Sequence, residues 1–121
     1  MNNYNVFFFA KSDGSEPARD FMSTLDDKMQ AKIAWTIELL KTDGPEVRLP
    51  YSKCLEDGIY EIRAKVSSNI TRVLYFFCVG KNIILTNGFV KKSQKTPKNE
   101  IYLAKKYRDE YMSRRNDHDQ F

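Results

Sequence analysis

The sequence predicts an α+β fold in which an antiparallel-rich sheet is packed by an N-terminal helical hairpin and a C-terminal helix. Between Ile59 and Val90, three β-type runs are joined by short turn signals, which is typical of consecutive hairpins. Two segments before this region and one after it repeat apolar residues at helical spacing. The 121 residues contain no internal repeat, so we expect a single domain spanning residues 1–121 with the order β-α-α-β-β-β-α.

The first third of the chain predicts a strand and then a helix. The apolar run Tyr4–Ala10 is typical of a strand, and the turn signal SDGSEP follows it. Ser15 is expected to cap the first helix, with Pro17 in its first turn. The apolar stripe of this helix consists of Ala18, Phe21, Met22 and Leu25.

A second helix is predicted from Asp26 or Asp27 to the breaker sequence Asp43-Gly44-Pro45. Trp35 is expected to pack inside the helical hairpin, and contact with a partner protein is the alternative. The segment Gly44–Asp57 contains two prolines and is expected to be a loop. The apolar stripe of the second helix, which we expect in the core, is Met29, Ile33, Ile37 and Leu40.

The second half predicts three strands and a last helix. Two-residue loops are expected at Ser67-Ser68 and at Gly80-Lys81. Thr96 is expected to cap the last helix, with Pro97 at its first position. Residues 113–121 are polar and are expected to form a flexible tail. The three predicted strands are Ile59–Val66, Ile70–Val79 and Asn82–Val90. The stripe expected to be buried in the last helix is Ile101, Ala104, Tyr107 and Tyr111.

The net charge of +4 is unevenly distributed along the chain. Residues 1–58 hold 7 basic and 10 acidic residues, a balance of −3, whereas residues 59–121 hold 13 and 6, a balance of +7. A localised positive field suits a polyanion such as nucleic acid, and a solvated basic surface is the alternative.

Composition and cysteine usage exclude several classes of protein. No apolar run reaches the length of a membrane helix, and the first residues show no signal peptide. Cys54 and Cys78 lack the spacing of a zinc site or a disulfide framework, so both are expected to be structural. We therefore expect a cytoplasmic protein without a metal or other cofactor and without a membrane partner.

Two-residue loops fix which residues of the three strands lie opposite each other. They place Arg63 opposite Arg72, Arg72 opposite Phe89, and Ile70 opposite both Lys65 and Lys91. Like charges opposite each other destabilise a sheet, so the arginine pair indicates an anion site, most simply for phosphate. Two alternatives stay open, since Glu61 can pair with Arg63 and a longer loop would change the register. An apolar floor is expected to continue this face through Leu74, Phe76, Leu85 and Ile83.

The motifs along the chain resemble those of a known toxin superfamily. The segment LEDGIYEIRAKVSSNITRVLYFF followed by GFVKKSQKTPKNEIYLAKKY resembles the RelE/ParE toxins of type II toxin–antitoxin systems, and in particular the HigB-like, phage-derived host-inhibition branch. The similarity extends from about Ala18 to Tyr107. It implies a RelE-like fold and a ribosome-dependent mRNA interferase that cuts RNA through its 2′-hydroxyl without a metal.

The resemblance also implies partners and site residues. The partners would be the ribosome, its mRNA, and a helix-turn-helix, HigA-like antitoxin that also mediates binding to operator DNA. Arg63, Arg72 and either Lys91 or Lys92 match the catalytic positions of the family. We expect the RNA to be contacted by Lys53, Lys65, Phe89 and Lys95.

Several assignments remain open at this stage. For Phe89, ordinary packing is the alternative to stacking on a base. The tyrosine that is catalytic in some members has no unambiguous match among Tyr102, Tyr107 and Tyr111, and His118 is the single histidine. A ParE-like inhibitor of DNA gyrase without RNase activity and a non-catalytic nucleic-acid-binding module are the alternative functions.

Overall fold

The computed structural model describes residues 3–92 and 95–119 and has the predicted α+β architecture. A five-stranded sheet has the strand order β1-β5-β4-β3-β2, with β1 parallel to β5 and the other neighbours antiparallel. The strands are β1 (Asn5–Phe8), β2 (Ser52–Glu56), β3 (Ile59–Val66), β4 (Asn69–Cys78) and β5 (Asn82–Val90). The helices are α1 (Pro17–Met22), α2 (Asp27–Asp43), the 3-10 turn η1 (Gly44–Glu46) and α3 (Lys98–Asp119).

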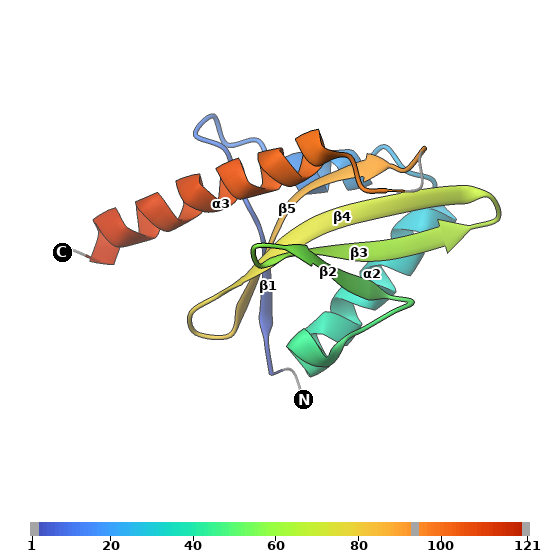
Figure 1. The fold of residues 1–121 in the computed structure, drawn as a ribbon, viewed down its shortest axis with the longest axis horizontal. Helices are drawn as coiled ribbons and strands as arrows, with labels where there is room; N and C mark the ends of the chain where they lie inside the picture. Colours follow the sequence, from blue (N-terminus) through green and yellow to red (C-terminus); the bar gives the residue numbers. More distant parts are fainter. Residues whose placement is uncertain (1–2, 93–94, 120–121) are drawn as a thin grey trace.

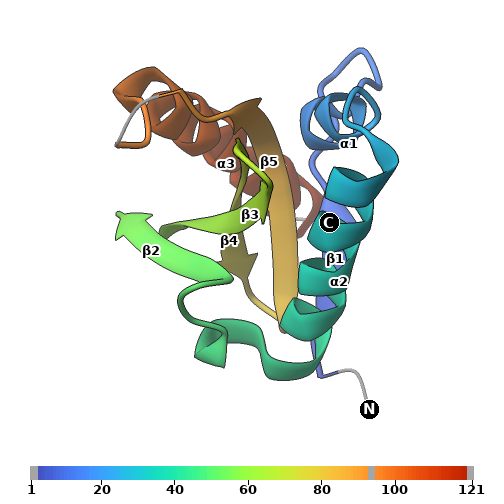
Figure 2. The same ribbon diagram turned by 90° about the vertical axis from the view of Figure 1, so that its right-hand side faces the viewer.

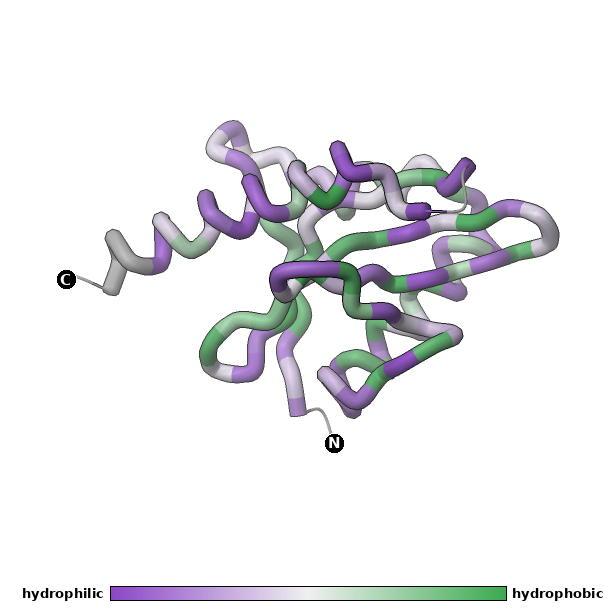
Figure 3. The backbone as a smooth tube through the Cα atoms, viewed as in Figure 1, coloured by the Kyte–Doolittle hydropathy of each residue, from purple (hydrophilic) through white to green (hydrophobic). Residues whose placement is uncertain are grey.

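The helices cover both faces of the sheet. Figure 2 shows α1 and α2 on one side of the sheet and α3 on the other. The apolar colours in Figure 3 concentrate in the central strands, while α3 is mostly polar. Each face therefore has its own apolar core, and α3 covers only part of its face, because the β3–β4 hairpin extends beyond the start of this helix (Figure 1).

The core under α1 and α2 confirms the predicted stripe of the second helix. Met29, Ile33, Ile37 and Leu40 are all buried against the sheet. Asp26 caps α2 through its side chain, which accepts a hydrogen bond from the Met29 amide at 2.9 Å. Burial of this stripe fixes which face of the sheet α2 covers.

The caps and ends of the other helices differ from the expectation. Glu16, not Ser15, is the residue before α1, and the Ser15 hydroxyl donates to Asp13 at 2.6 Å and does not cap the helix. Helix α3 begins at Lys98, one residue after Pro97. The predicted tail is helical from Ser113 to Asp119, where α3 ends. Residues 120–121 lie outside the described part, and the flexibility of the tail stays a prediction. Ile101, Ala104 and Tyr107 are buried, as predicted, and Tyr111 packs edge-on against Phe76.

The segment Gly44–Asp57 is not only a loop. It contains η1 and the strand β2, which pairs with β3 from Ser52 opposite Ile62 to Glu56 opposite Ile59. Ser52 is buried there, and its hydroxyl hydrogen-bonds the Tyr75 hydroxyl. The pairing between β2 and β3 adds an edge strand to the sheet beside the predicted arginine pair.

The register of the β3–β4 hairpin agrees with the prediction, and that of the β4–β5 hairpin agrees at one end only. Arg63 lies opposite Arg72, and Arg72 opposite Phe89. At the other end, Cys78 pairs with Asn82, so the turn has three residues instead of two. A bulge at Thr86 absorbs the extra residue, and the Thr86 hydroxyl donates to the Leu74 carbonyl at 3.1 Å.

The bulge corrects the predicted apolar floor. Leu74 and Phe76 lie on the α3 face as expected, but Ile84 joins them in place of Ile83 and Leu85. Those two residues belong to the core under α2, because one extra residue reverses the facing of a strand. Helix α3 covers this floor through Ala104 and Tyr107.

Candidate phosphate-binding site

The centre of the candidate site is a buried carboxylate shared by two arginines. Glu61 on β3 is 1 % exposed, and its Oε2 lies 3.4 Å from Arg63 Nη1 and 3.5 Å from Arg72 Nε. Its Oε1 accepts a hydrogen bond from the Thr96 hydroxyl at 2.6 Å. The carboxylate therefore links β3, β4 and the segment before α3, and it offsets part of the positive charge of the two arginines.

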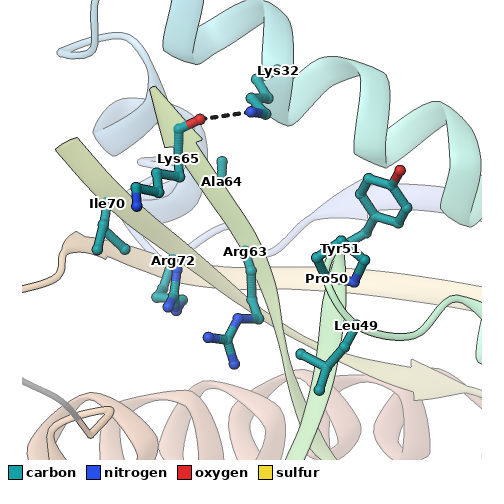
Figure 4. Close-up of a pocket in the computed structure, with 9 residues that line it drawn as sticks. All are labelled: Lys32, Leu49, Pro50, Tyr51, Arg63, Ala64, Lys65, Ile70 and Arg72. Atoms are coloured by element: carbon teal, nitrogen blue, oxygen red, sulfur yellow. Dashed lines mark hydrogen bonds between the residues drawn. The ribbon is translucent and has the colours of Figure 1, made fainter. Parts of the chain in front are cut away.

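The two arginines differ in exposure. The Arg72 residue is 4 % exposed, whereas 27 % of the Arg63 side chain is accessible. Figure 4 shows the two side chains close together on neighbouring strands. Burial and the neighbouring Arg63 charge lower the pKa of Arg72, and Glu61 opposes this shift, so the guanidinium is held charged in an unfavourable environment.

Arg72 has hydrogen-bonding capacity to spare. Its Nη1 donates to the Thr71 carbonyl at 3.2 Å. Its buried Nε has an ion-pair contact with Glu61 but no hydrogen-bond acceptor among the described residues. A buried donor without an acceptor is unfavourable, and the Glu61 oxygen 3.5 Å away offsets this cost only through its charge.

Lys91 is a predicted lysine whose electrostatic surroundings include both arginines. Its amide donates to the Ile70 carbonyl at 2.8 Å, which continues the β4–β5 pairing by one residue. Burial lowers the pKa of Lys91, and the charges of Arg72, Arg63 and Lys53 lower it further, against the opposing effect of Glu61. Lys92 is exposed and does not line the hollow described next.

A hollow of about 340 Å³ lies over this cluster. Cationic residues from three parts of the chain line it, and Glu61 and Thr96 form part of its wall. The predicted site residues that it brings together are Lys53, Arg63, Lys91 and Lys95. A concave surface with this many cations is suited to a phosphate group of a polyanion.

A second hollow of about 570 Å³ adjoins the first through Arg63. Arg72 and Lys65 line it, so every predicted cation except Lys92 borders one of the two hollows. Phe89 differs, because it is 9 % exposed and belongs to the apolar core under α3. This burial supports ordinary packing, the alternative to base stacking.

The remaining candidates lie elsewhere. Tyr107 stacks on Phe9 with ring centroids 4.7 Å apart, Tyr102 is exposed, and neither they nor Tyr111 line the two hollows. His118 belongs to the last turns of α3. Cys54 is exposed and Cys78 half-buried, and both are free thiols.

Two features were missed or misplaced from the sequence. The central role of Glu61 was foreseen only as a pairing with Arg63, although its alternation with Arg63 on β3 carried the signal. Trp35 is 54 % exposed and not in the core, and it contacts Tyr51 with ring centroids 5.2 Å apart. Its position two residues after Ile33, about 200° around the helix, could have shown this.

The described residues contain no group of His, Cys, Asp and Glu arranged to hold a metal ion. Within the same residues, no helix is long and apolar enough to cross a membrane.

The five-stranded sheet, with helices before and after its antiparallel strands in the chain, is consistent with a RelE-like α+β fold. Residues 20–109 match the family model described as "Phage derived protein Gp49-like (DUF891)", which covers α2, the β2–β5 sheet and half of α3. The chain therefore belongs to the Gp49-like family, a RelE/HigB-like family associated with the toxins of toxin–antitoxin systems. No curated protein matches the sequence.

Proposed function

We propose that the protein is a toxin that cuts mRNA on the ribosome by attack of an RNA 2′-hydroxyl on the adjacent phosphorus. The observation that carries this proposal is the pairing of Arg63 with Arg72 around the buried Glu61 carboxylate. Two permanently charged guanidinium groups fixed on neighbouring strands are suited to a phosphate whose negative charge grows during the reaction.

In the proposed reaction, the 2′ oxygen forms a bond to phosphorus and the bond to the 5′ oxygen breaks. The products are a 2′,3′-cyclic phosphate and a 5′-hydroxyl end. The proton of the 2′-hydroxyl passes to water, and protonated Lys91 donates a proton to the departing 5′ oxygen. A lowered pKa makes Lys91 a better proton donor than an ordinary lysine.

The arginines have a different part in this scheme. Arg63 and Arg72 bind the non-bridging oxygens and hold the phosphate in line with the 2′ oxygen. Lys53, Lys65 and Lys95 bind the flanking backbone of the strand. The chain has a single histidine, so we propose that the ribosome contributes to orienting the mRNA. The family also suggests an antitoxin partner, which we propose to be a helix-turn-helix protein of the HigA type.

The test is to induce the protein in cells and to map 5′-hydroxyl ends in ribosome-bound transcripts. We expect new ends within coding regions for the wild type and their loss in Arg63→Gln and Lys91→Ala. Lys81→Ala, in the distant β4–β5 turn, is the matched control and should cut normally. Absence of new ends in the wild type, with inhibition of DNA gyrase instead, would overturn the proposal.

A further inference from the structure

The second hollow differs from the first in that apolar groups form much of its wall. Leu49, Pro50 and Tyr51 line one side, and β3 and β4 line the other (Figure 4). The hollow lies where the β2–β3 pairing ends, at Ser52 opposite Ile62 and at the bond that the Arg63 amide donates to the Tyr51 carbonyl at 2.8 Å. Beyond that pair, Ala64 and Lys65 border the hollow where a strand would otherwise lie.

An exposed aromatic pair stands beside this hollow. Trp35 on α2 is 54 % exposed and Tyr51 is 39 % exposed, with ring centroids 5.2 Å apart and ring planes inclined by 55°. Leu49, which lines the same hollow as Tyr51, is 60 % exposed. A cluster of large apolar groups in water is unfavourable and marks a surface that binds a ligand.

Cations lie among these apolar groups. Lys32 is one helical turn before Trp35 on α2, and its Nζ donates to the Lys65 carbonyl at 2.6 Å. Figure 4 shows this bond across the top of the hollow, with Arg63 below it. Aromatic rings interleaved with cations are typical of surfaces that bind single-stranded nucleic acid, where rings stack on bases and cations pair with phosphates.

We propose that Trp35 and Tyr51 form a stacking site for one unpaired base of the RNA strand that the arginine pair holds. This inference rests on the proposed function and adds a subsite to it. Arg63 lines both hollows, so a strand with a phosphate in the first has a neighbouring nucleotide within reach of the second. A base in a duplex is already stacked and paired, so the site selects single strands.

Trp35 reports on its own occupancy, because it is the only tryptophan in the chain. The experiment is to titrate the wild-type protein with a short RNA carrying 2′-O-methyl groups, which blocks attack by the 2′ oxygen. We expect saturable quenching of the tryptophan fluorescence by the single strand and none by the same sequence as a duplex. In a series of RNAs with one abasic nucleotide each, one position should abolish the quenching while the number of phosphates is unchanged.

Variants separate stacking from general attraction. Trp35→Ala should weaken binding of labelled RNA, followed by anisotropy, about tenfold, whereas Trp35→Phe should retain most of the affinity. Val79→Ala is the matched control, because Val79 is an exposed apolar residue in the β4–β5 turn, at the other end of the sheet (Figure 1). It should change neither the affinity nor the quenching.

The outcomes distinguish this inference from the proposed function. Quenching that no abasic position removes, or equal affinities of the wild type and Trp35→Ala, would overturn the stacking site even if transcripts are cut. Position-specific quenching without any cut transcripts would instead support the stacking site and overturn the interferase. A site used by a protein partner alone would give no quenching with RNA, which also contradicts the inference.

Discussion

At the scale of single residues, the Glu61 carboxylate decides whether two arginines can stay buried together. The carboxylate forms ion pairs with Arg63 and Arg72 and accepts a hydrogen bond from Thr96, and Glu61 is 1 % exposed. Without its charge, the two guanidinium groups would face each other on neighbouring strands with no compensation. Removing one partner of a buried charge group is costly, because the remaining charge cannot be solvated.

Glu61→Gln is therefore expected to lower the free energy of unfolding by about 3–5 kcal/mol, measured by urea denaturation. Glu56→Gln is the matched control. Glu56 also pairs with a cation, Lys105, at 2.6 Å, but its side chain is 57 % exposed. An exposed pair contributes about 1 kcal/mol or less, so equal losses in the two variants would contradict the assigned role of Glu61.

Lys91 gives the site a dependence on pH. The charged form exists below its pKa, which its surroundings lower, so RNA affinity should begin to fall at a pH where an ordinary lysine is still charged. Lys91→Arg keeps the positive charge to higher pH, so the fall in RNA affinity should move to higher pH. The measurement is anisotropy of uncleavable RNA against pH at constant ionic strength. Coincident curves for the two proteins would exclude Lys91 as the titrating group.

At the scale of elements, Gly88 fixes how closely α1 approaches β5. A Cβ atom at this position would collide with the Phe21 ring and lie 3.1 Å from the Arg72 carbonyl oxygen. Phe21 follows the apolar spacing of α1 and packs against the core below it. The glycine thus lets a helix lie directly behind the strand segment that carries Arg72's partner, Phe89.

Gly88→Ala is expected to lower the free energy of unfolding by about 1–3 kcal/mol, because the added methyl group overpacks this contact. The double variant Gly88→Ala with Phe21→Leu should recover part of the loss, since the smaller side chain leaves room. Thermal or urea unfolding of the two variants and of Phe21→Leu alone measures the coupling. A purely additive result would contradict the steric explanation.

The elements also show what a sequence can predict here. The β3–β4 register follows from a two-residue turn, so Arg63 opposite Arg72 was predictable from Ser67-Ser68 alone. The bulge at Thr86 depends on packing of both sheet faces, and nothing in the local sequence marks it. Strand β2, with sequence SKCLE and a proline just before it, lacks a clear alternation and reads as a loop.

Only part of the candidate site was predictable from the alternation of side chains along the strands. Alternation along a strand assigns residues to a face, and this brought Arg63, Arg72 and Lys91 together. Alternation does not show how deeply a side chain is buried. It therefore did not reveal that Phe89 is buried under α3 or that Glu61 lies between the arginines. The second hollow requires the ends of β2 and α2 to be placed in space, which no pattern within one element provides.

At the scale of the whole molecule, cations from both halves of the sequence line the two neighbouring hollows, among them Lys53, Arg63 and Lys91. Binding of RNA there should depend on salt, with a slope of log affinity against log salt near −0.7 for each phosphate neutralised on a single strand. The phosphate at the arginine pair and the flanking phosphates at Lys53, Lys65 and Lys95 together predict a slope of about −3. Lys53→Gln should reduce its magnitude by about 0.7, while Lys81→Ala should leave it unchanged. A slope unaffected by Lys53→Gln would show that this lysine binds no phosphate.

The strand order has a consequence for how the protein behaves in concentrated solution. The outermost strands, β1 and β2, have four and five residues, and the uncovered stretch of β3 has its Lys65 carbonyl occupied by the Lys32 amine. Edges this short, with charged side chains beside them, are poor templates for strand addition by a second copy. The sheet thus carries protection against edge-to-edge aggregation in the same region that offers its aromatic and cationic groups to a ligand.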